Sequence, residues 1–499
     1  MKKAAHFMNG RSGAVKSSIE EDNLDSWFRH GTDLFRYLLL HQKSFLLSLT
    51  VLVLLVPFVM NYTLGKPLLN GSESYYHLSL ASQQHWFTGN YQFLLPMISY
   101  IPVLVLWLSS FLMGIATIIL FLFVLEDLKV DNKISFFFAL LIIVSPFFIF
   151  AFTTLSSSGF FLFLLSLGFF LLVKGGKARF FALFSFFFAT FFDLYSTFIL
   201  FLTLLLFFWS DFYQSEGGRE ELFKPNLKKE KFIFLAGVGV LFLIHLLILN
   251  QPFFLGPFYV QQFIPDLISD LGGLSGISFF VFLLFVIGIS ITWKNRSFGK
   301  IYFFLPVVFL GYYYSTQTVL ITCVVILFFA TVGLVHLLER KWLLQNVKKF
   351  TFLLLFLGIL FSTLTYLNRL PFFGPSLDDE RSLTWISKNT ASEGIVFSDS
   401  LNADYITYFA QRKPFSFIRS NITVQNSTAA IFEAQYIQDL FPLLEQNNIS
   451  IIYLNAQMKK TLPSEYGLLF LLKNERFKLV HSSGDSEVWM FLREGESQS

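Results

Sequence analysis

Cysteine and charged side chains are scarce in this sequence. Cys323 is the only cysteine among 499 residues, so the chain cannot form an internal disulfide, and any outer domain must be held by its own hydrophobic core. Charged residues make up 14% of the chain and hydrophobic residues 54%. Soluble globular proteins have a very different balance, so the bilayer is expected to be the main solvent.

Several motifs of soluble enzymes are also missing. The sequence has no phosphate-binding glycine loop, no Cys/His metal spacing and no serine nucleophile elbow. These absences argue against chemistry driven by a nucleotide. The net charge of +4 is small, and no nucleic acid partner is expected.

Apolar segments long enough to approach or span a membrane recur between residues 44 and 367. They predict about eleven transmembrane helices, and therefore a polytopic α-helical membrane protein. The segments are 44–64, 97–125, 134–152, 157–173, 180–192, 194–209, 232–249, 277–291, 301–314, 319–338 and 350–367.

Basic residues predict the orientation of these helices. They cluster at 174–179, 224–231, 294–300 and 340–349, which are all cytoplasmic loops if the N-terminus is cytoplasmic. The predicted outer loops between the first and last span contain a single Lys or Arg residue, Lys66. An odd number of spans then places the C-terminal region outside the cytoplasm. The first apolar segment follows a long polar tail and is expected to act as a signal anchor.

Changes in composition along the chain predict three regions. Residues 1–43 form a cytoplasmic tail with an amphipathic, interfacial helix, and residues 44–367 form the transmembrane domain. Two long outer loops, 65–96 and 250–276, are where binding and chemistry are expected. Residues 368–499 are predicted to form an extracytoplasmic α/β domain with a mostly parallel sheet. Its expected helices are 378–389, 403–411 and 426–447, and its expected strands are 394–398, 414–418, 449–454, 476–481 and 487–492.

Four acidic residues are expected near the outer membrane boundary, where an ionisable group is costly to bury and is often functional. They are Glu73, Asp193, Asp266 and Asp270. A carboxylate there could act as a general base or bind a hard divalent cation. The alternative for each is a solvated loop charge or a helix cap.

The segment Gly71-Ser72-Glu73-Ser74-Tyr75-Tyr76-His77-Leu78 resembles the first outer loop of the GT-C glycosyltransferase superfamily. It is most similar to archaeal members related to the catalytic subunit of oligosaccharyltransferase, with Glu73 in place of the usual Asp. The stretch 146–159, which joins two predicted spans, agrees with this resemblance. Segments 383–390, 395–398 and 405–412 look like the start of the outer domains of such proteins.

The resemblance implies roles for particular residues. Glu73 would be the base or a metal ligand, and Asp270 the second carboxylate. His77 and His85 would contact the donor phosphate, with interfacial packing as the alternative for each. Asp193 and Asp266 are possible additional acids. A Mg²⁺ or Mn²⁺ ion would be held by Glu73 and Asp270, with donor phosphate and water completing its ligands.

The sequence also departs from the family pattern in three places. Ser156-Ser157-Ser158-Gly159 stands where a second acidic motif is common, and Leu267-Ile268-Ser269-Asp270 where oligosaccharyltransferases carry Thr-Ile-x-Glu. Asp399-Ser400-Leu401-Asn402-Ala403 stands where they carry Trp-Trp-Asp-Tyr-Gly. Glycosylation directed to Asn sequons is therefore not supported.

These features favour a membrane glycosyltransferase that uses a polyprenyl-phosphate-linked sugar donor. The polyprenyl tail would stay among membrane lipid while the sugar reaches a protein or glycan acceptor on the extracytoplasmic face. The main alternative is a GT-C-fold protein without catalysis that acts as a scaffold or partner-binding subunit. A transporter is a third possibility, although no clear internal repeat is visible.

Overall fold

The computed structural model describes most of the chain, in several stretches. They are residues 41–82, 102–190, 198–205, 236–240, 243, 247, 267–273, 275–293, 302, 305, 306, 309, 316–417 and 422–492. These residues form two compact units. The helical unit contains the described residues of 41–58 and 107–370, and the sheet unit contains those of 59–82, 102–106 and 371–492.

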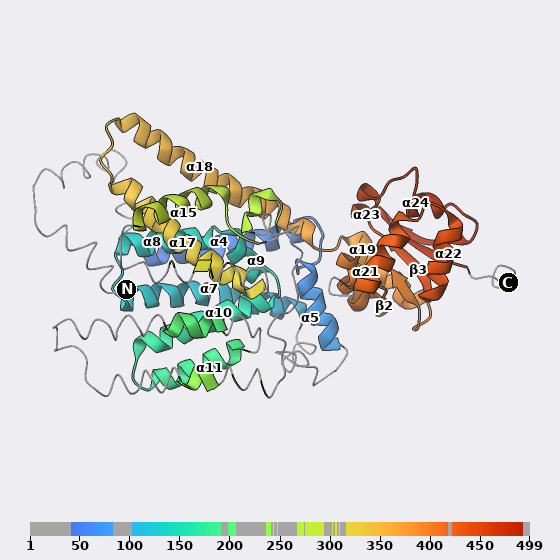
Figure 1. The fold of residues 1–499 in the computed structure, drawn as a ribbon, viewed down its shortest axis with the longest axis horizontal. Helices are drawn as coiled ribbons and strands as arrows, with labels where there is room; N and C mark the ends of the chain where they lie inside the picture. The colour runs from blue at the N-terminus through green and yellow to red at the C-terminus, as the bar shows by residue number, and fades with distance from the viewer. Residues whose placement is uncertain are drawn as a thin grey trace, which may run out of the picture. The chain divides into compact units, whose positions relative to one another are not determined.

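Long apolar helices make up the helical unit (Figure 1). Among the described residues, five helices are long and apolar enough to cross a membrane, or up to six if a bent pair is one span. The chain is therefore a multi-pass membrane protein by helix length and composition. The helices are α4 (Gln42–Thr63), α7 (Val103–Asp127), α8 (Asn132–Ile143), α9 (Pro146–Thr153), α10 (Ser157–Lys174), α11 (Ala178–Thr190), η3 (Ser269–Leu271), α15 (Phe279–Thr292), α17 (Thr316–Glu339) and α18 (Gln345–Arg369).

The predicted count of about eleven spans is not confirmed. Predicted spans 232–249 and 301–314 lie largely outside the described residues, span 194–209 is described only at 198–205, and α11 and α15 are shorter than a full span. The predicted amphipathic helix of the tail also lies outside the described residues, as do 83–96 and 250–266 of the two outer loops.

The predicted single span 134–152 is wrong in one respect, because it is a bent pair. α8 and α9 meet at an angle of 58°. Ser145 is extended, with ψ of 137°, and Pro146 occupies the first turn of α9. A proline ring disfavours helical backbone at the preceding residue, so the chain leaves α8 before Pro146 and starts a new helix there.

Glycine allows α15 and α17 to pack closely along each other. A Cβ atom on Gly288 would lie 1.9 Å from the carbonyl oxygen of Phe329. One on Gly333 would lie 2.4 Å from the carbonyl oxygen of Leu284. The two backbones therefore touch without side chains between them, as is common between membrane helices.

The sheet unit contains a five-stranded mixed sheet, with strand order β2-β1-β3-β5-β4. β1 pairs in parallel with β2 and β3, whereas β5 pairs antiparallel with β3 and β4. The expectation of a mostly parallel sheet is therefore wrong, because two of the four strand pairs, β3–β5 and β4–β5, are antiparallel. The strands are β1 (Ile395–Phe397), β2 (Lys413–Pro414), β3 (Ile449–Leu454), β4 (Phe477–Ser483) and β5 (Ser486–Phe491).

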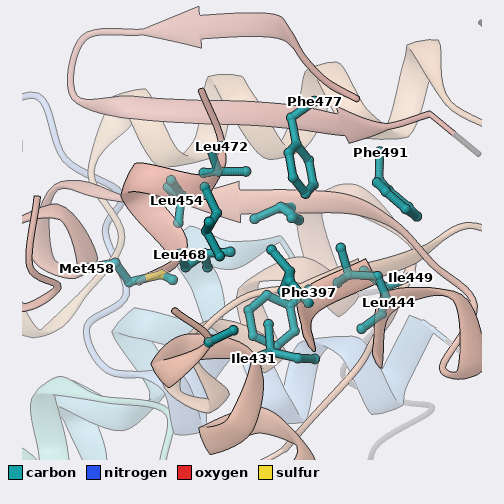
Figure 2. Close-up of a cluster of buried hydrophobic side chains, with 14 residues drawn as sticks. Phe397, Ile431, Leu444, Ile449, Leu454, Met458, Leu468, Leu472, Phe477 and Phe491 are labelled. Atoms are coloured by element: carbon teal, nitrogen blue, oxygen red, sulfur yellow. The ribbon is translucent and has the colours of Figure 1, made fainter. Parts of the chain in front are cut away.

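Helices complete the sheet unit, and the last four of them contribute to the core of the sheet. They are α5 (Ser72–Ser82), α19 (Leu377–Asn389), η6 (Ser400–Asn402), α20 (Ala403–Tyr405), the π-helix η7 (Ile406–Ala410), α21 (Ile422–Glu433), α22 (Ile437–Gln446), α23 (Ala456–Thr461) and α24 (Leu468–Leu471); the 3-10 turn η5 (Leu370–Phe373) follows α18. Figure 2 shows side chains from β1, β3, β4 and β5 and from α21, α22, α23 and α24 pointing into one buried cluster.

The predicted single helix 426–447 is two helices, α21 and α22. Ile431 and Ala434 are buried in the core, and so are Leu440 and Leu444. In one straight helix, Leu440 would lie about 240° around the axis from Ala434, at about 100° per residue. The break before Tyr436, which has an extended backbone, turns both apolar pairs toward the same core.

Candidate functional site

The segment with Glu73 is held at its start by a buried polar cluster. Gly71 has φ of +75°, in the left-handed region that glycine adopts without strain, and α5 begins at the next residue. Asn61 Nδ2 donates to Asn70 Oδ1 at 2.9 Å, and Ser74 Oγ donates to the Asn70 carbonyl at 2.6 Å. These bonds fix the start of α5 against the end of α4.

Glu73 and His77 lie together on one face of α5, because residues four apart in a helix are neighbours. His77 Nε2 is 3.5 Å from Glu73 Oε1. The His77 side chain is 4% exposed and that of Glu73 is 32% exposed. Glu73 also lies in the first turn of α5, where the helix dipole stabilises a carboxylate. The pair therefore offers a partly exposed carboxylate backed by a buried imidazole.

Tyr75 lies among aromatic side chains of the sheet unit. Its ring centroid is 5.2 Å from that of Tyr405, 5.5 Å from that of Tyr408 and 5.2 Å from that of Phe409. The Tyr75 hydroxyl donates to the carbonyl of Leu69 at 3.2 Å. We call Tyr405, Tyr408 and Phe409 the aromatic cage. It accounts for the burial of Tyr75, which is only 3% exposed.

Burial keeps these phenols neutral. It raises the pKa of Tyr75 well above the ordinary value of 10.0, and the neighbouring Tyr405 and Glu380 raise it further. Burial, followed by the Glu380 charge, also raises the pKa of Tyr408. The tyrosines therefore act as packing groups and hydrogen-bond donors, and they do not supply a base.

Asp270 lies in the helical unit, where protein donors occupy both of its carboxylate oxygens. Oδ2 accepts from the backbone N–H of Phe279, at the start of α15, at 2.7 Å. Oδ1 accepts a short hydrogen bond from the Ser362 hydroxyl. Arg369 donates to the carbonyls of Ser269 and Gly273, at 2.7 and 3.0 Å. These contacts attach the loop around Asp270 to α15 and α18.

A cavity of about 550 Å³ lies beside Asp270, within the helical unit. The polar residues of its lining are Asp270, Ser362, Thr365, Tyr366 and Arg369. The remainder is lined mostly by apolar side chains of α15 and α18, including Phe280 and Phe361.

The predicted site residues thus fall into three groups. The structure brings Glu73 and His77 together. It places Asp270 in the other compact unit, so a cation site shared by Glu73 and Asp270 stays a prediction. His85, Asp193 and Asp266 lie outside the described residues.

The residues that the structure describes contain no group of three or more His, Cys, Asp or Glu side chains placed to hold a metal ion. Glu73 and His77 together offer a carboxylate and an imidazole nitrogen as metal ligands, whereas Mg²⁺ and Mn²⁺ favour several oxygen ligands. These two residues alone do not fit a resident cation.

Structural contacts occupy two segments that depart from the pattern of the superfamily that the sequence resembles. The Ser156 hydroxyl accepts from the Gly159 N–H at 3.1 Å and caps α10. Asn402 Nδ2 donates to Ser398 Oγ at 3.0 Å, and Asn402 Oδ1 accepts from Asn455 Nδ2 at 3.0 Å. Both regions therefore serve helix capping and strand packing.

Sequence reasoning missed Arg369 and the partners of Tyr75. Arg369 carried a detectable signal, because it is a cation at the end of the last apolar segment, where helix carbonyls need donors. The aromatic cage carried none, since Tyr405, Tyr408 and Phe409 lie more than three hundred residues from Tyr75 in the sequence.

Comparisons with known proteins identify the fold. No protein-family model matches the sequence, and no curated protein matches it. The structure nevertheless resembles those of GT-C glycosyltransferases. The oligosaccharyltransferase of Archaeoglobus fulgidus, solved with a tethered acceptor peptide containing the NVT sequon, matches with a TM-score of 0.50 and 13% identity, over 91% of this chain and 74% of that one.

Two further solved structures are similar at lower scores. The same oligosaccharyltransferase in complex with zinc and sulfate has a TM-score of 0.49 and 14% identity, over 90% of this chain and 73% of that one. ArnT from Cupriavidus metallidurans, bound to undecaprenyl phosphate, has a TM-score of 0.46 and 13% identity, over 89% of this chain and 98% of that one. At these identities the likeness concerns the fold.

Proposed function

We propose that this protein is a membrane glycosyltransferase that moves a sugar from a polyprenyl-phosphate-linked donor to an acceptor on the extracytoplasmic face. The observation that carries the proposal is the Glu73–His77 pair, directly after the first span of a chain with a GT-C-like fold. Apolar spanning helices suit a donor whose tail stays in the bilayer. The acceptor is a protein or a glycan.

In the proposed reaction, Glu73 is the general base. An acceptor hydroxyl or amide attacks the anomeric carbon of the donor sugar, and the bond from that carbon to the phosphate oxygen breaks. Polyprenyl phosphate leaves with the bonding electron pair, and the acceptor's proton passes to the Glu73 carboxylate. His77, being almost fully buried, orients this carboxylate. The expected donor-phosphate contact of His77 remains a prediction, as does the role of Asp270 as second carboxylate.

The test is Glu73→Gln in the full-length protein reconstituted in nanodiscs. The donor is a polyprenyl phosphate carrying radiolabelled glucose or mannose, and membranes lacking the protein supply acceptors. Because the amide cannot take a proton, transfer into non-lipid products should fall by about 100-fold. The exposed Glu465 provides a matched control, since Glu465→Gln changes the charge equally and should leave transfer unchanged. Equal transfer by Glu73→Gln and wild type would exclude this role for Glu73.

A second candidate is a GT-C-fold protein that has lost catalysis and serves as a scaffold or partner-binding subunit. The capping role of Ser156 and the closed network around Asn402 favour it, because both replace motifs that the catalytic family carries. Stable co-purification with another membrane enzyme, together with no binding of polyprenyl phosphate, would support the scaffold. Saturable binding of polyprenyl phosphate would count against it.

A further inference from the structure

α5 has two opposite faces with different neighbours. At about 100° per residue, Tyr75 points about 200° away from Glu73, whereas His77 is about 40° from it. The Tyr75 face is buried in the aromatic cage, and the opposite face carries the partly exposed Glu73 carboxylate. Seating Tyr75 in the cage therefore fixes the rotation of α5 about its axis and the direction of Glu73.

The cage is built by an unusual helical segment. α5 packs against α20 and the π-helix η7. Tyr405 ends α20, and its hydroxyl donates to the carbonyl of Phe373 at 3.1 Å. Tyr408 and Phe409 lie in η7 and contact each other, with centroids 4.9 Å apart. A π-turn is rare and often lies beside a functional site, and here it supplies two of the three rings around Tyr75.

A second attachment holds the loop before α5. Lys66 Nζ donates to the carbonyl of Pro371 at 3.0 Å and lies 3.9 Å from the centroid of the Phe372 ring. Burial lowers the pKa of Lys66, although the nearby Asp379 opposes this effect. The loop is thus attached through Lys66 to Pro371 and Phe372, and α5 is attached through Tyr75 to the aromatic cage.

We propose that Tyr75 is a positioning residue, which uses the aromatic cage of the C-terminal domain to set the orientation of Glu73. The inference rests on the proposed function for its catalytic consequence. Its structural part, that the cage orients α5, is independent of any activity. Movement of the cage would move the Glu73 carboxylate, so the C-terminal domain would control the geometry of transfer.

The structural part can be measured by thiol labelling. Cys323 is buried, so a Glu73→Cys variant of the full-length protein in nanodiscs has one accessible thiol. We expect Tyr408→Ala in this background to change the rate of maleimide labelling by about threefold or more, since removing a packed ring frees the neighbouring side chains. Tyr466→Ala is the control, because this tyrosine is 60% exposed. An unchanged rate with Tyr408→Ala would overturn the proposal.

The catalytic part is measured by transfer kinetics in the native Glu73 background. Tyr75→Ala should lower kcat by about tenfold or more while the donor KM stays within about twofold, because positioning acts on the transition state. Tyr75→Phe keeps the ring and should retain most of kcat. Equal loss of kcat in Tyr75→Phe and Tyr75→Ala would overturn the positioning role. If wild type transfers no sugar but labelling responds to the cage, the orientation by the cage stands and the transferase proposal falls.

Discussion

The hydrogen bonds of Asp270 occupy the carboxylate oxygens that its predicted role as second carboxylate would need. One carboxylate oxygen caps the start of α15 through Phe279 N–H, and the other accepts from Ser362. A side chain with these contacts holds the loop around Asp270 in place. A capping carboxylate contributes about 1 kcal/mol, and a hydrogen bond to a charged group about 1.5–3 kcal/mol.

Asp270→Asn should therefore reveal which role dominates. The amide oxygen can still accept from one donor, so we expect a modest loss of thermal stability and transfer within about threefold of wild type. Ser362→Ala removes one partner of the carboxylate and should lower stability by a similar amount. Thermal unfolding and transfer rates of the reconstituted variants measure both effects. A fully stable Asp270→Asn protein without transfer would instead support the second-carboxylate role.

At the level of elements, the contact between α15 and α17 depends on two glycines. A Cβ atom on Gly288 would lie far inside contact distance of the Phe329 carbonyl oxygen. The helices must separate to admit it, and they would lose packing along their contact. The buried rings near this crossing, including Phe285 and Phe329, would then lose contacts too.

We expect Gly288→Ala to destabilise the protein by about 1–3 kcal/mol, as overpacking of a close contact does. Gly239→Ala is the matched control, because a Cβ there would lie 3.6 Å from a Phe201 ring carbon, an ordinary contact. Fluorescence-monitored thermal unfolding in the same detergent should show a fall in Tm for Gly288→Ala alone. Similar Tm values for both variants would show that α15 and α17 can separate without a loss of protein stability.

Element boundaries show what the sequence can reveal. The apolar runs that became α4, α7, α10, α17 and α18 were predictable, because a bilayer demands a long apolar segment. The bend at Pro146 has a local sequence signal, because a proline disfavours helical backbone at the preceding residue. The break between α21 and α22 required knowing that Ala434 and Leu440 share a core, which is tertiary information.

The candidate site was predictable to a similar extent. The pairing of Glu73 with His77 follows from helical spacing only once the segment is known to be a helix, whereas the sequence predicts an outer loop there. The partners of Asp270 and Tyr75 do not, because they come from segments distant in sequence, such as Ser362 and Tyr405. The roles of the paired residues in catalysis remain predictions.

At the level of the whole molecule, the distribution of positive charge predicts orientation. Four basic clusters lie in predicted cytoplasmic loops, and the loop at 174–179 is one of them. The same assignment places the sheet unit's C-terminal part outside the cytoplasm. Lys177 and Glu465 are both exposed residues, so cysteines at these positions can report on the two sides.

The orientation is testable in intact cells with a membrane-impermeant maleimide. Because Cys323 is buried, wild type should give little background. Glu465→Cys should be labelled in intact cells, whereas Lys177→Cys should be labelled only after the membrane is permeabilised. The expectation follows from the energetic and insertion bias that keeps Lys and Arg on the cytoplasmic side. The opposite pattern would place Glu73 and the C-terminal domain in the cytoplasm, and an extracytoplasmic sugar transfer would then be excluded.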